Sequence, residues 1–243
     1  MNANASVNIL KVKNKPNEPE YKKLENSVKF SFNITYIFLL TTATITFIEA
    51  IRTPFPNIRH VMNLETCISV VAGYFYSVFM AKISTSEEKR ENIDWAEITQ
   101  TRYIDWAITT PMMLLALCLV LSQNSKTTIH VFTILGIIAL NYIMLYFGYL
   151  GEMKTMDKKT ADFAGFAAFF AMFYIIFNQF VKPVFRLDNM ALYGFYLIIW
   201  SMYGIVYMFN EEYKNIAMNY LDLTAKCLIG LGLWVYYTKI VRL

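Results

Sequence analysis

The sequence predicts an all-α membrane protein of the seven-transmembrane-helix bundle class. Of the 243 residues, 56% are hydrophobic and only 16% are charged, and the mean hydropathy is +0.38. That composition is too apolar for an ordinary soluble domain. The apolar residues gather in seven stretches, each near the length of about 20 residues that a membrane-spanning helix requires. Inside a bilayer every backbone polar group needs an internal partner, so these stretches are expected to be helices.

The predicted spans are separated by polar segments that combine charge with Pro, Asn, Ser or Thr. These breaks read RTPFPNIRH, KISTSEEKREN, SQNSKTT, EMKTMDKKT, KPVFRLDN and NEEYKN. The spans between them lie near residues 28–50, 61–82, 93–121, 129–151, 162–181, 190–210 and 216–240. Because short connections make neighbouring helices antiparallel, the spans are expected to form one domain over residues 28–243.

The segments outside the spans exclude several other classes of protein. Residues 1–27 are polar and rich in lysine, lack the apolar core of a signal peptide, and are expected to form a tail outside the bundle. The net charge of +4 is spread over loops and tails, so nucleic acid is not an expected partner. The histidines and cysteines lack metal-ligand spacing, so no metal site is expected. Lysines and arginines divide evenly between the loops of the two sides, so loop charge does not indicate the orientation.

Four ionisable residues lie deep inside the predicted spans: Arg102, Asp105, Asp222 and Lys226. Charged side chains at membrane depth are costly and mark functional sites. Their formal charges sum to zero, and a buried charge needs a partner. We therefore expect the four to form one cluster.

Helical spacing supports this cluster. Arg102 and Asp105 share one helix face with Trp106, Thr109 and Met113. Residues 222 and 226 are four apart, so they also share a face.

A lysine near two carboxylates in a dry cavity is a poised amine, and it can form a Schiff base with an aldehyde. Trp106, Trp200, Tyr203 and Tyr207 would wall a slot for a long, flat, apolar aldehyde, although ordinary bundle packing also accounts for such aromatic residues. The sequence therefore predicts a covalent site for such a ligand at Lys226.

Three stretches resemble the microbial rhodopsins. RYIDWAITTP, residues 102–111, matches the third-helix motif of that family, and LDLTAK, residues 221–226, matches the seventh-helix motif that carries the retinal lysine. WSMYGIVY, residues 200–207, is similar to the sixth-helix pocket, although Gly204 stands where many members have Pro and Tyr207 where many have Trp. The resemblance extends over all seven spans.

The resemblance implies that Lys226 carries all-trans-retinal as a protonated Schiff base, with Asp105 and Asp222 as its counterions. Asp105 is then the proton acceptor. Asp222 accepts hydrogen bonds from Tyr203 and from a tyrosine of the second helix. The resemblance also implies an extracellular N-terminus and a cytoplasmic C-terminus.

Further roles follow from the same motifs. Tyr76 is the expected second-helix tyrosine, with Tyr74 as the alternative. Arg102 would lie on the extracellular side of the counterions, and Thr109 beside Asp105. The implied retinal-site residues, of which Thr110 and Asn141 also link the third and fourth helices, are Trp106, Thr110, Met113, Asn141, Met144, Gly148, Trp200, Tyr203 and Tyr207.

Residues that separate pumps from channels point in two directions. Ala116 stands where proton-pumping members carry a carboxylate, and alanine donates no proton. Lys214 stands where one of two extracellular release glutamates is expected, with Glu212 as the candidate for the other. Glu65 on the second span and Glu49 at the end of the first would line a cation path.

The resulting hypothesis is a light-gated cation channel, favoured also because IEAIRT and RHVMNLETCISVVAGYFYS are similar to viral rhodopsins of giant algal viruses. The alternative is a light-driven outward proton pump with Glu65 as cytoplasmic donor, and a photosensory receptor is the third. A transporter or receptor without retinal would not explain the charges and aromatic residues together, and no enzymatic activity is expected. The expected partners are the lipid bilayer, retinal, the transported cations or protons, and further copies of the chain, since relatives form homo-oligomers.

Overall fold

The fold is a bundle of seven membrane-crossing helices. The computed structural model describes residues 18–89 and 92–239, with side chains from residue 26 onward. The elements, in chain order, are α2 (Glu18–Arg52), α3 (Pro56–Lys89), α4 (Trp95–Ser125), α5 (Val131–Glu152), α6 (Lys158–Ile176), η1 (Phe177–Val181), α7 (Leu187–Tyr207), α8 (Glu211–Asp222), η2 (Leu223–Leu228) and α9 (Ile229–Thr238). The π-helical segment η1 extends α6, and η2 joins α8 to α9 in one rod. Seven helical spans within the described residues are long and apolar enough to cross a membrane, which confirms the predicted fold class.

The helices run further than the apolar stretches that predicted them. α2 begins at Glu18 rather than near residue 28, and α3 continues through charged sequence to Lys89 rather than ending near residue 82. Lysine and glutamate are good helix formers, so a helix does not stop where its apolar part stops. The predicted tail over residues 1–27 thus joins α2 at residue 18, and its residues 1–17 lie outside the described part of the chain.

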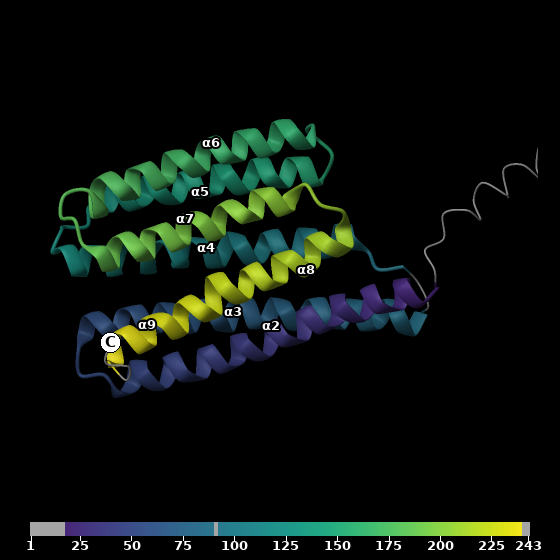
Figure 1. The fold of residues 1–243 in the computed structure, drawn as a ribbon, viewed down its shortest axis with the longest axis horizontal. Coiled ribbons are helices and arrows are strands. Elements are labelled where there is room, and N and C mark those ends of the chain that lie inside the picture. The colour runs from purple at the N-terminus through teal and green to yellow at the C-terminus, as the bar shows by residue number, and fades with distance from the viewer. Residues whose placement is uncertain (1–17, 90–91, 240–243) are drawn as a thin grey trace, which may run out of the picture.

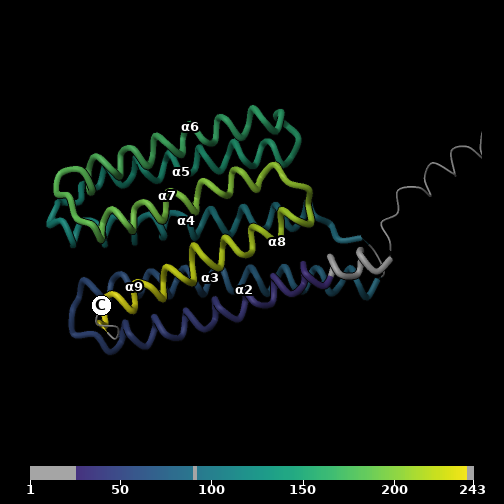
Figure 2. The backbone as a smooth tube through the Cα atoms, in the orientation of Figure 1, coloured from purple at the N-terminus to yellow at the C-terminus, as the bar shows by residue number. Residues whose placement is uncertain are grey.

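The last rod passes through the interior of the bundle. Figure 1 shows α5 and α6 side by side at one edge, α2 and α3 at the opposite edge, and the rod of α8 and α9 between α2 and α7. In Figure 2 the first coloured turns of α2 and the end of α9 lie at opposite ends of the bundle. We call these the N-terminal end and the C-terminal end. This arrangement places the residues of η2 near the centre of the molecule.

Three helices that start at the N-terminal end have side-chain caps. Asp94 precedes α4, Asp157 precedes α6 and Asn210 precedes α8, and each side chain accepts a hydrogen bond from a backbone N–H of the first turn. Such caps satisfy donors that a helix start leaves free. The backbone N–H and the hydroxyl of Thr160 both donate to Asp157, and they hold the pKa of this carboxyl below its ordinary value.

Pro111 lies inside α4 without ending it. Proline lacks the N–H that would bond to the carbonyl oxygen four residues earlier. That oxygen belongs to Ala107, and the hydroxyl of Tyr142 on α5 donates to it over 3.1 Å. The contact replaces the lost hydrogen bond and allows α4 to continue through the middle of the bundle.

Candidate functional site

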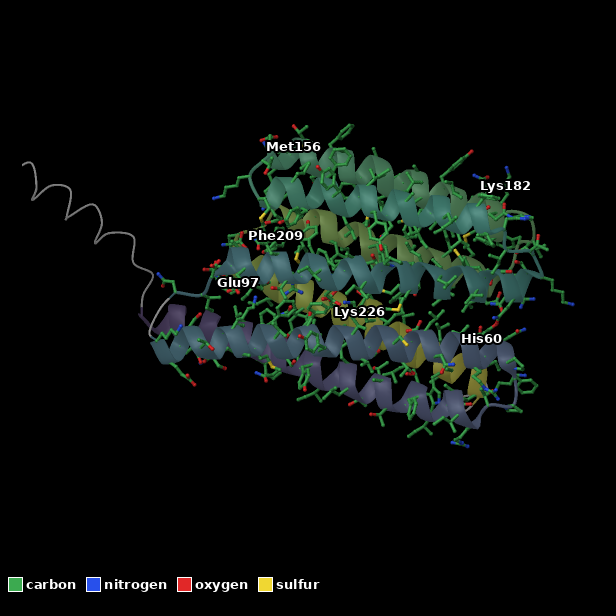
Figure 3. The ribbon with its side chains drawn as sticks, turned by 180° about the vertical axis from the view of Figure 1, so that it is seen from behind. His60, Glu97, Met156, Lys182, Phe209 and Lys226 are labelled. Atoms are coloured by element: carbon green, nitrogen blue, oxygen red, sulfur yellow. The ribbon has the colours of Figure 1, made fainter. Side chains whose placement is uncertain are left out.

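Four charged side chains meet near the centre of the bundle, and each is at most 1% exposed. Lys226 Nζ lies 2.7 Å from Asp105 Oδ2 and 3.8 Å from Asp222 Oδ1. Arg102 Nη1 lies 3.2 Å from Asp222 Oδ2. Figure 3 shows Lys226 between the helices near their mid-length, with His60 towards one end and Glu97 towards the other. The structure therefore brings together all four charges that were expected to cluster.

Asp222 is held by four donors. Its Oδ2 accepts from the Tyr76 hydroxyl over 2.9 Å and from Arg102, and its Oδ1 accepts from the Tyr203 hydroxyl over 2.8 Å and from Trp106 Nε1 over 3.3 Å. Both carboxylate oxygens of Asp222 are therefore satisfied by hydrogen bonds.

Asp105 has a much sparser environment. Its Oδ2 accepts from Lys226, whereas its Oδ1 is buried and has no hydrogen-bond partner among the described residues. The hydroxyl of Thr109 lies one turn further along α4, but it donates to the backbone oxygen of Asp105 rather than to the carboxylate. The two aspartates thus face the same amine, but Asp222 accepts four other hydrogen bonds and the carboxylate of Asp105 accepts none beyond that from Lys226 among the described residues.

The choice between the two second-helix tyrosines depends on which side of α3 each one occupies. Tyr76 is completely buried and contacts Asp222, whereas Tyr74 is 64% exposed on the outer face. Of the two alternatives, Tyr76 is the tyrosine at the site.

Two asparagines of α8 belong to the site, although sequence reasoning missed them. Arg102 Nη2 donates to Asn219 Oδ1 over 2.7 Å and to Asn215 Oδ1 over 3.1 Å. The hydroxyl of Tyr76 lies 3.1 Å from the same Asn219 oxygen. The sequence did contain a signal, because polar residues recur every three or four positions over residues 215–226 and so share one helix face.

A cavity opens beside Lys226, between α4, α5, α6, α7 and the rod that carries Lys226. It encloses about 790 Å³ of empty space, including its mouth, which is typical of small-molecule sites. The lining residues are Tyr103, Trp106, Thr110, Met113, Met144, Leu145, Gly148, Ala161, Asp162, Gly165, Phe166, Phe169, Trp200, Tyr203, Gly204, Tyr207, Met218, Asp222 and Lys226. The cavity is therefore mostly apolar and aromatic, with an amine and a carboxylate at one place in its wall.

Every residue expected to contact the ligand lines this cavity except Asn141. Asn141 is fully buried, and its Nδ2 donates to Thr110 Oγ1 over 2.8 Å. Thr110 lines the cavity, and the amide of Asn141 lies behind it, where it links α5 to α4. The expected link between the third and fourth membrane-spanning helices is therefore present. The expected contact of Asn141 with the ligand is not, because Asn141 does not line the cavity.

Gly204 shapes the cavity at the position where related motifs have proline. A Cβ at this position would collide with the ring of Phe166 on α6. The absence of a side chain on α7 lets that ring come forward and form part of the wall. Phe166 is a lining residue that sequence reasoning did not identify.

Glu65 lies buried on the other side of Lys226, towards the C-terminal end. Its side chain is 1% exposed, and its Oε1 has no hydrogen-bond partner among the described residues. A Cβ at Gly230 would come 3.0 Å from Glu65 Oε2, so the carboxyl group lies against the backbone of α9. Gly230 follows Lys226 by four residues, a rise of about 6 Å along a helix. The hydroxyls of Thr42 and Ser69 are also buried and without partners in the described structure.

Two expected ion-path glutamates lie away from the site. Glu49 and Glu212 are both half-buried near helix ends, and within the described residues neither side chain forms a hydrogen bond or an ion pair. Both side chains therefore lie outside the hydrogen-bonded network of the described interior. The buried Lys214 instead pairs with Glu211 and with Glu152.

A family model described as "Bacteriorhodopsin-like protein" matches residues 26–240. The chain belongs to this family. Solved structures agree: this rhodopsin is 40% identical to the viral rhodopsin OLPVRII, with a TM-score of 0.81 over 88% of this chain and 98% of that one. No match was found among curated proteins.

More distant rhodopsins share the fold. A blue light-absorbing proteorhodopsin from Med12 is 21% identical, with a TM-score of 0.69 over 89% of this chain and 99% of that one. The proton pumping rhodopsin AR2 from the marine alga Acetabularia acetabulum is 21% identical, with a TM-score of 0.70 over 89% and 97% of the two chains. The protein is thus a multi-pass membrane protein of a family that binds retinal and carries out light-driven ion transport.

The residues present fit retinal. The cavity is apolar, and Lys226 provides an amine in its wall with two carboxylates within 3.8 Å. The carboxylates balance the positive charge that this nitrogen carries. Lys226 would hold the chromophore, and Trp106 and Trp200 would contact it along the cavity.

The link between α4 and α5 gives a prediction about stability. In Thr110→Val the methyl group replaces the hydroxyl, and the buried Nδ2 of Asn141 loses its acceptor. An unsatisfied buried donor costs about 1–3 kcal/mol, so the free energy of unfolding should fall by this amount. Thermal bleaching of the purified rhodopsin measures the change. The control is Thr41→Val, since Thr41 is exposed and bonds only within its own helix. Equal bleaching temperatures for the two variants would contradict the prediction.

Proposed function

We propose that the protein is a light-driven outward proton pump whose N-terminal end is extracellular and whose C-terminal end is cytoplasmic. All-trans-retinal, when bound, supplies the absorption of light and a change of shape at the Lys226 nitrogen. The observation that carries the proposal is Glu65, whose carboxyl group is buried on the cytoplasmic side of this nitrogen. Asp105 and Glu65 then act on opposite sides of the same atom.

Asp105 is the residue that accepts the proton from the Lys226 nitrogen. It lies 2.7 Å away, and one of its oxygens has no other partner in the described structure. Asp222 is less suited, because four donors already occupy its two oxygens. The unequal hydrogen bonding of the two aspartates supports a proton transfer in one direction.

Glu65 is the residue that returns a proton to the Lys226 nitrogen. A charged carboxylate without partners is very costly in an apolar interior, so Glu65 carries a proton at rest. Gly230 leaves room for its carboxyl group against the rod that also carries Lys226. Glu65 thus donates the proton that Ala116 on α4 cannot donate, because alanine has no acidic group.

A light-gated cation channel is the second candidate, and one observation favours it. A buried polar row runs from Arg102 through Asn219 to Ser31, with Asn219 Nδ2 donating to Ser31 Oγ over 2.9 Å. Such groups line the extracellular half of an ion path. In the cytoplasmic half the buried polar groups do not continue this row of hydrogen bonds, since Thr42 Oγ1, Glu65 Oε1 and Ser69 Oγ have no partner among the described residues. The pump is therefore the better supported of the two functions.

Voltage-clamp recording under illumination separates the two functions. For a pump we expect a stationary outward photocurrent that keeps its sign across the voltage range and is unaffected when sodium or potassium gradients are inverted. A channel passes ions down their gradient, so its current would reverse with that gradient. A reversing photocurrent would overturn the proposed function and establish the second candidate.

A further inference from the structure

A second group of polar side chains lines the cavity on the side of α6, away from Lys226. The group consists of Tyr103 on α4, Asp162 on α6 and Tyr207 on α7, and we call it the α6-side patch. α6 lies at the edge of the bundle and packs against α5 and α7, whereas η2, which carries Lys226, packs against α2, α3 and α7 (Figure 1). The amine and the patch therefore belong to different walls of one cavity.

Contacts with two glycines show that the α6-side patch is compact. The Tyr207 hydroxyl donates to the backbone oxygen of Gly148 over 3.1 Å, and a Cβ at Gly148 would lie 2.6 Å from Tyr103 Oη. A Cβ at Gly204, nearly one turn before Tyr207, would lie 3.3 Å from Asp162 Oδ1. The two hydroxyls thus meet at one glycine, and the carboxylate lies beside the turn of α7 that carries one of them. Tyr103 also interacts electrostatically with both other members of the patch.

Two members of the patch are free to bind a ligand. Within the described part of the chain, the half-buried Asp162 carboxylate forms no hydrogen bond or ion pair, and the Tyr103 hydroxyl forms no hydrogen bond. Lys158, four residues before Asp162 on α6, attracts this carboxylate, but it forms its ion pair with Glu152 at 3.5 Å. Every other lining side chain with a hydroxyl, an amine or a carboxyl group forms at least one hydrogen bond. The unused hydrogen-bonding capacity of the lining is therefore concentrated in this patch.

The chemistry of these two free groups matches a hydroxyl group of a ligand. A carboxylate accepts hydrogen bonds, whereas a phenol both donates and accepts them. A ligand hydroxyl can therefore donate to Asp162 and accept from Tyr103 at the same time. A ketone in the same place can accept from Tyr103 but has no proton for Asp162, and an apolar group can bond to neither.

We propose that Asp162 makes the cavity selective for a retinal that carries a hydroxyl group on its ring. Retinal is attached to Lys226 through its aldehyde carbon, and its ring is at the other end of the molecule. A ligand that crosses the cavity from the rod therefore brings its ring to the opposite wall, where the α6-side patch lies. An apolar ring edge there excludes water from Asp162 and Tyr103 without replacing the lost hydrogen bonds, and this costs free energy. The inference uses only the binding of retinal at Lys226, and it goes beyond the proposed direction of proton transport.

Competition between two aldehydes tests the selectivity. The retinal-free protein in detergent receives an equimolar excess of all-trans-retinal and all-trans-3-hydroxyretinal, and the bound chromophores are then extracted and quantified by chromatography. The wild type should bind about tenfold more of the hydroxylated form, the lower range for a hydrogen bond to a charged group. Asp162→Leu removes the acceptor and keeps a similar size, so it should show no preference. Because the ratio is measured within each variant, a lower yield of pigment does not affect it.

A second pair of ligands tests the direction of the hydrogen bond. The ketone at the same ring position resembles the alcohol in size but has no proton to donate. In competition with unmodified retinal, the wild type should therefore not prefer this ketone.

Asp157→Asn is the matched control variant. It removes a carboxylate from the start of the same helix, but Asp157 does not line this cavity, and asparagine still caps the helix. This variant should keep the wild-type preference for the alcohol. If Asp162→Leu forms no pigment, Asp162→Asn takes its place. Its neutral amide oxygen accepts a weaker hydrogen bond, so the preference should fall below that of the wild type.

Three results would overturn the inference. They are a wild type without a preference for the alcohol over retinal, a wild type that takes up the ketone as readily as the alcohol, and an unchanged preference in the Asp162 variant that forms pigment. Failure of the retinal site itself is distinguishable, because no aldehyde would then give a coloured protein, and the inference would fail with it. A reversing photocurrent, in contrast, would overturn the proposed pump and leave the selectivity of the cavity intact.

Discussion

Lys226→Ala should give a protein that binds no chromophore and shows no visible absorption band after purification with all-trans-retinal. Lys226 is the one amine that lines the cavity within the described residues, and both carboxylates of the central site face it. Alanine cannot form the covalent link to the aldehyde. The measurement is the visible absorption spectrum of the purified protein, and we expect complete loss of the band rather than a shift.

Two controls show whether the loss of colour comes from misfolding or from the change of any buried lysine. Far-ultraviolet circular dichroism shows whether Lys226→Ala keeps its helices. Lys214→Arg changes a second lysine that is almost completely buried, and this variant should keep its colour. A visible band of wild-type intensity in Lys226→Ala would remove this residue from the site, and the assignment of both aspartates would fall with it.

Glu65→Gln should slow the recovery of the Lys226 nitrogen after a flash by about 100-fold, the lower range for loss of a general acid. Glutamine keeps the shape of the side chain but has no acidic proton to give. The titratable side chains that interact with Glu65, Tyr196 and Cys227, are much weaker acids than a carboxyl group, so they replace it poorly. Time-resolved absorption at the visible band measures the recovery.

Glu49→Gln is the matched control for this variant. Glu49 lies on α2 at the same end of the bundle, but it is only half-buried and its side chain has no partner among the described residues. The recovery rate of Glu49→Gln should therefore equal that of the wild type. A small permeant weak acid in the medium should partly restore the rate of Glu65→Gln, because it brings a proton to the same place. Unchanged recovery in Glu65→Gln, together with altered ion selectivity of the photocurrent, would assign Glu65 to a pore instead.

Membrane crossing and the number of helices could be predicted from the sequence alone. Both depend on local composition, because lipid excludes irregular backbone and each span must therefore be helical along its own length. The helix ends were less predictable. α2 and α3 continue through charged residues that form helix well, and nothing local marks the point at which the lipid ends.

The charged centre of the site could also be predicted, for a similar reason. Arg102 and Asp105 are three residues apart on one helix, and Asp222 and Lys226 are four apart on another. Residues at these spacings share a helix face. The cost of burying charges then requires the two faces to meet. The same rule, applied to Asn215 and Asn219, would have added them to the site.

The partners of each group depend on contacts between helices, which spacing does not describe. Tyr76 rather than Tyr74 reaches Asp222, and Glu211 rather than Glu212 reaches Lys214, because the rotation of each helix about its axis is set by packing against its neighbours. The difference between the two aspartates arises in the same way, since three of the four donors to Asp222 come from residues far away in the chain. Local sequence therefore accounts for which charges lie in the membrane, and long-range packing accounts for which of them can exchange a proton.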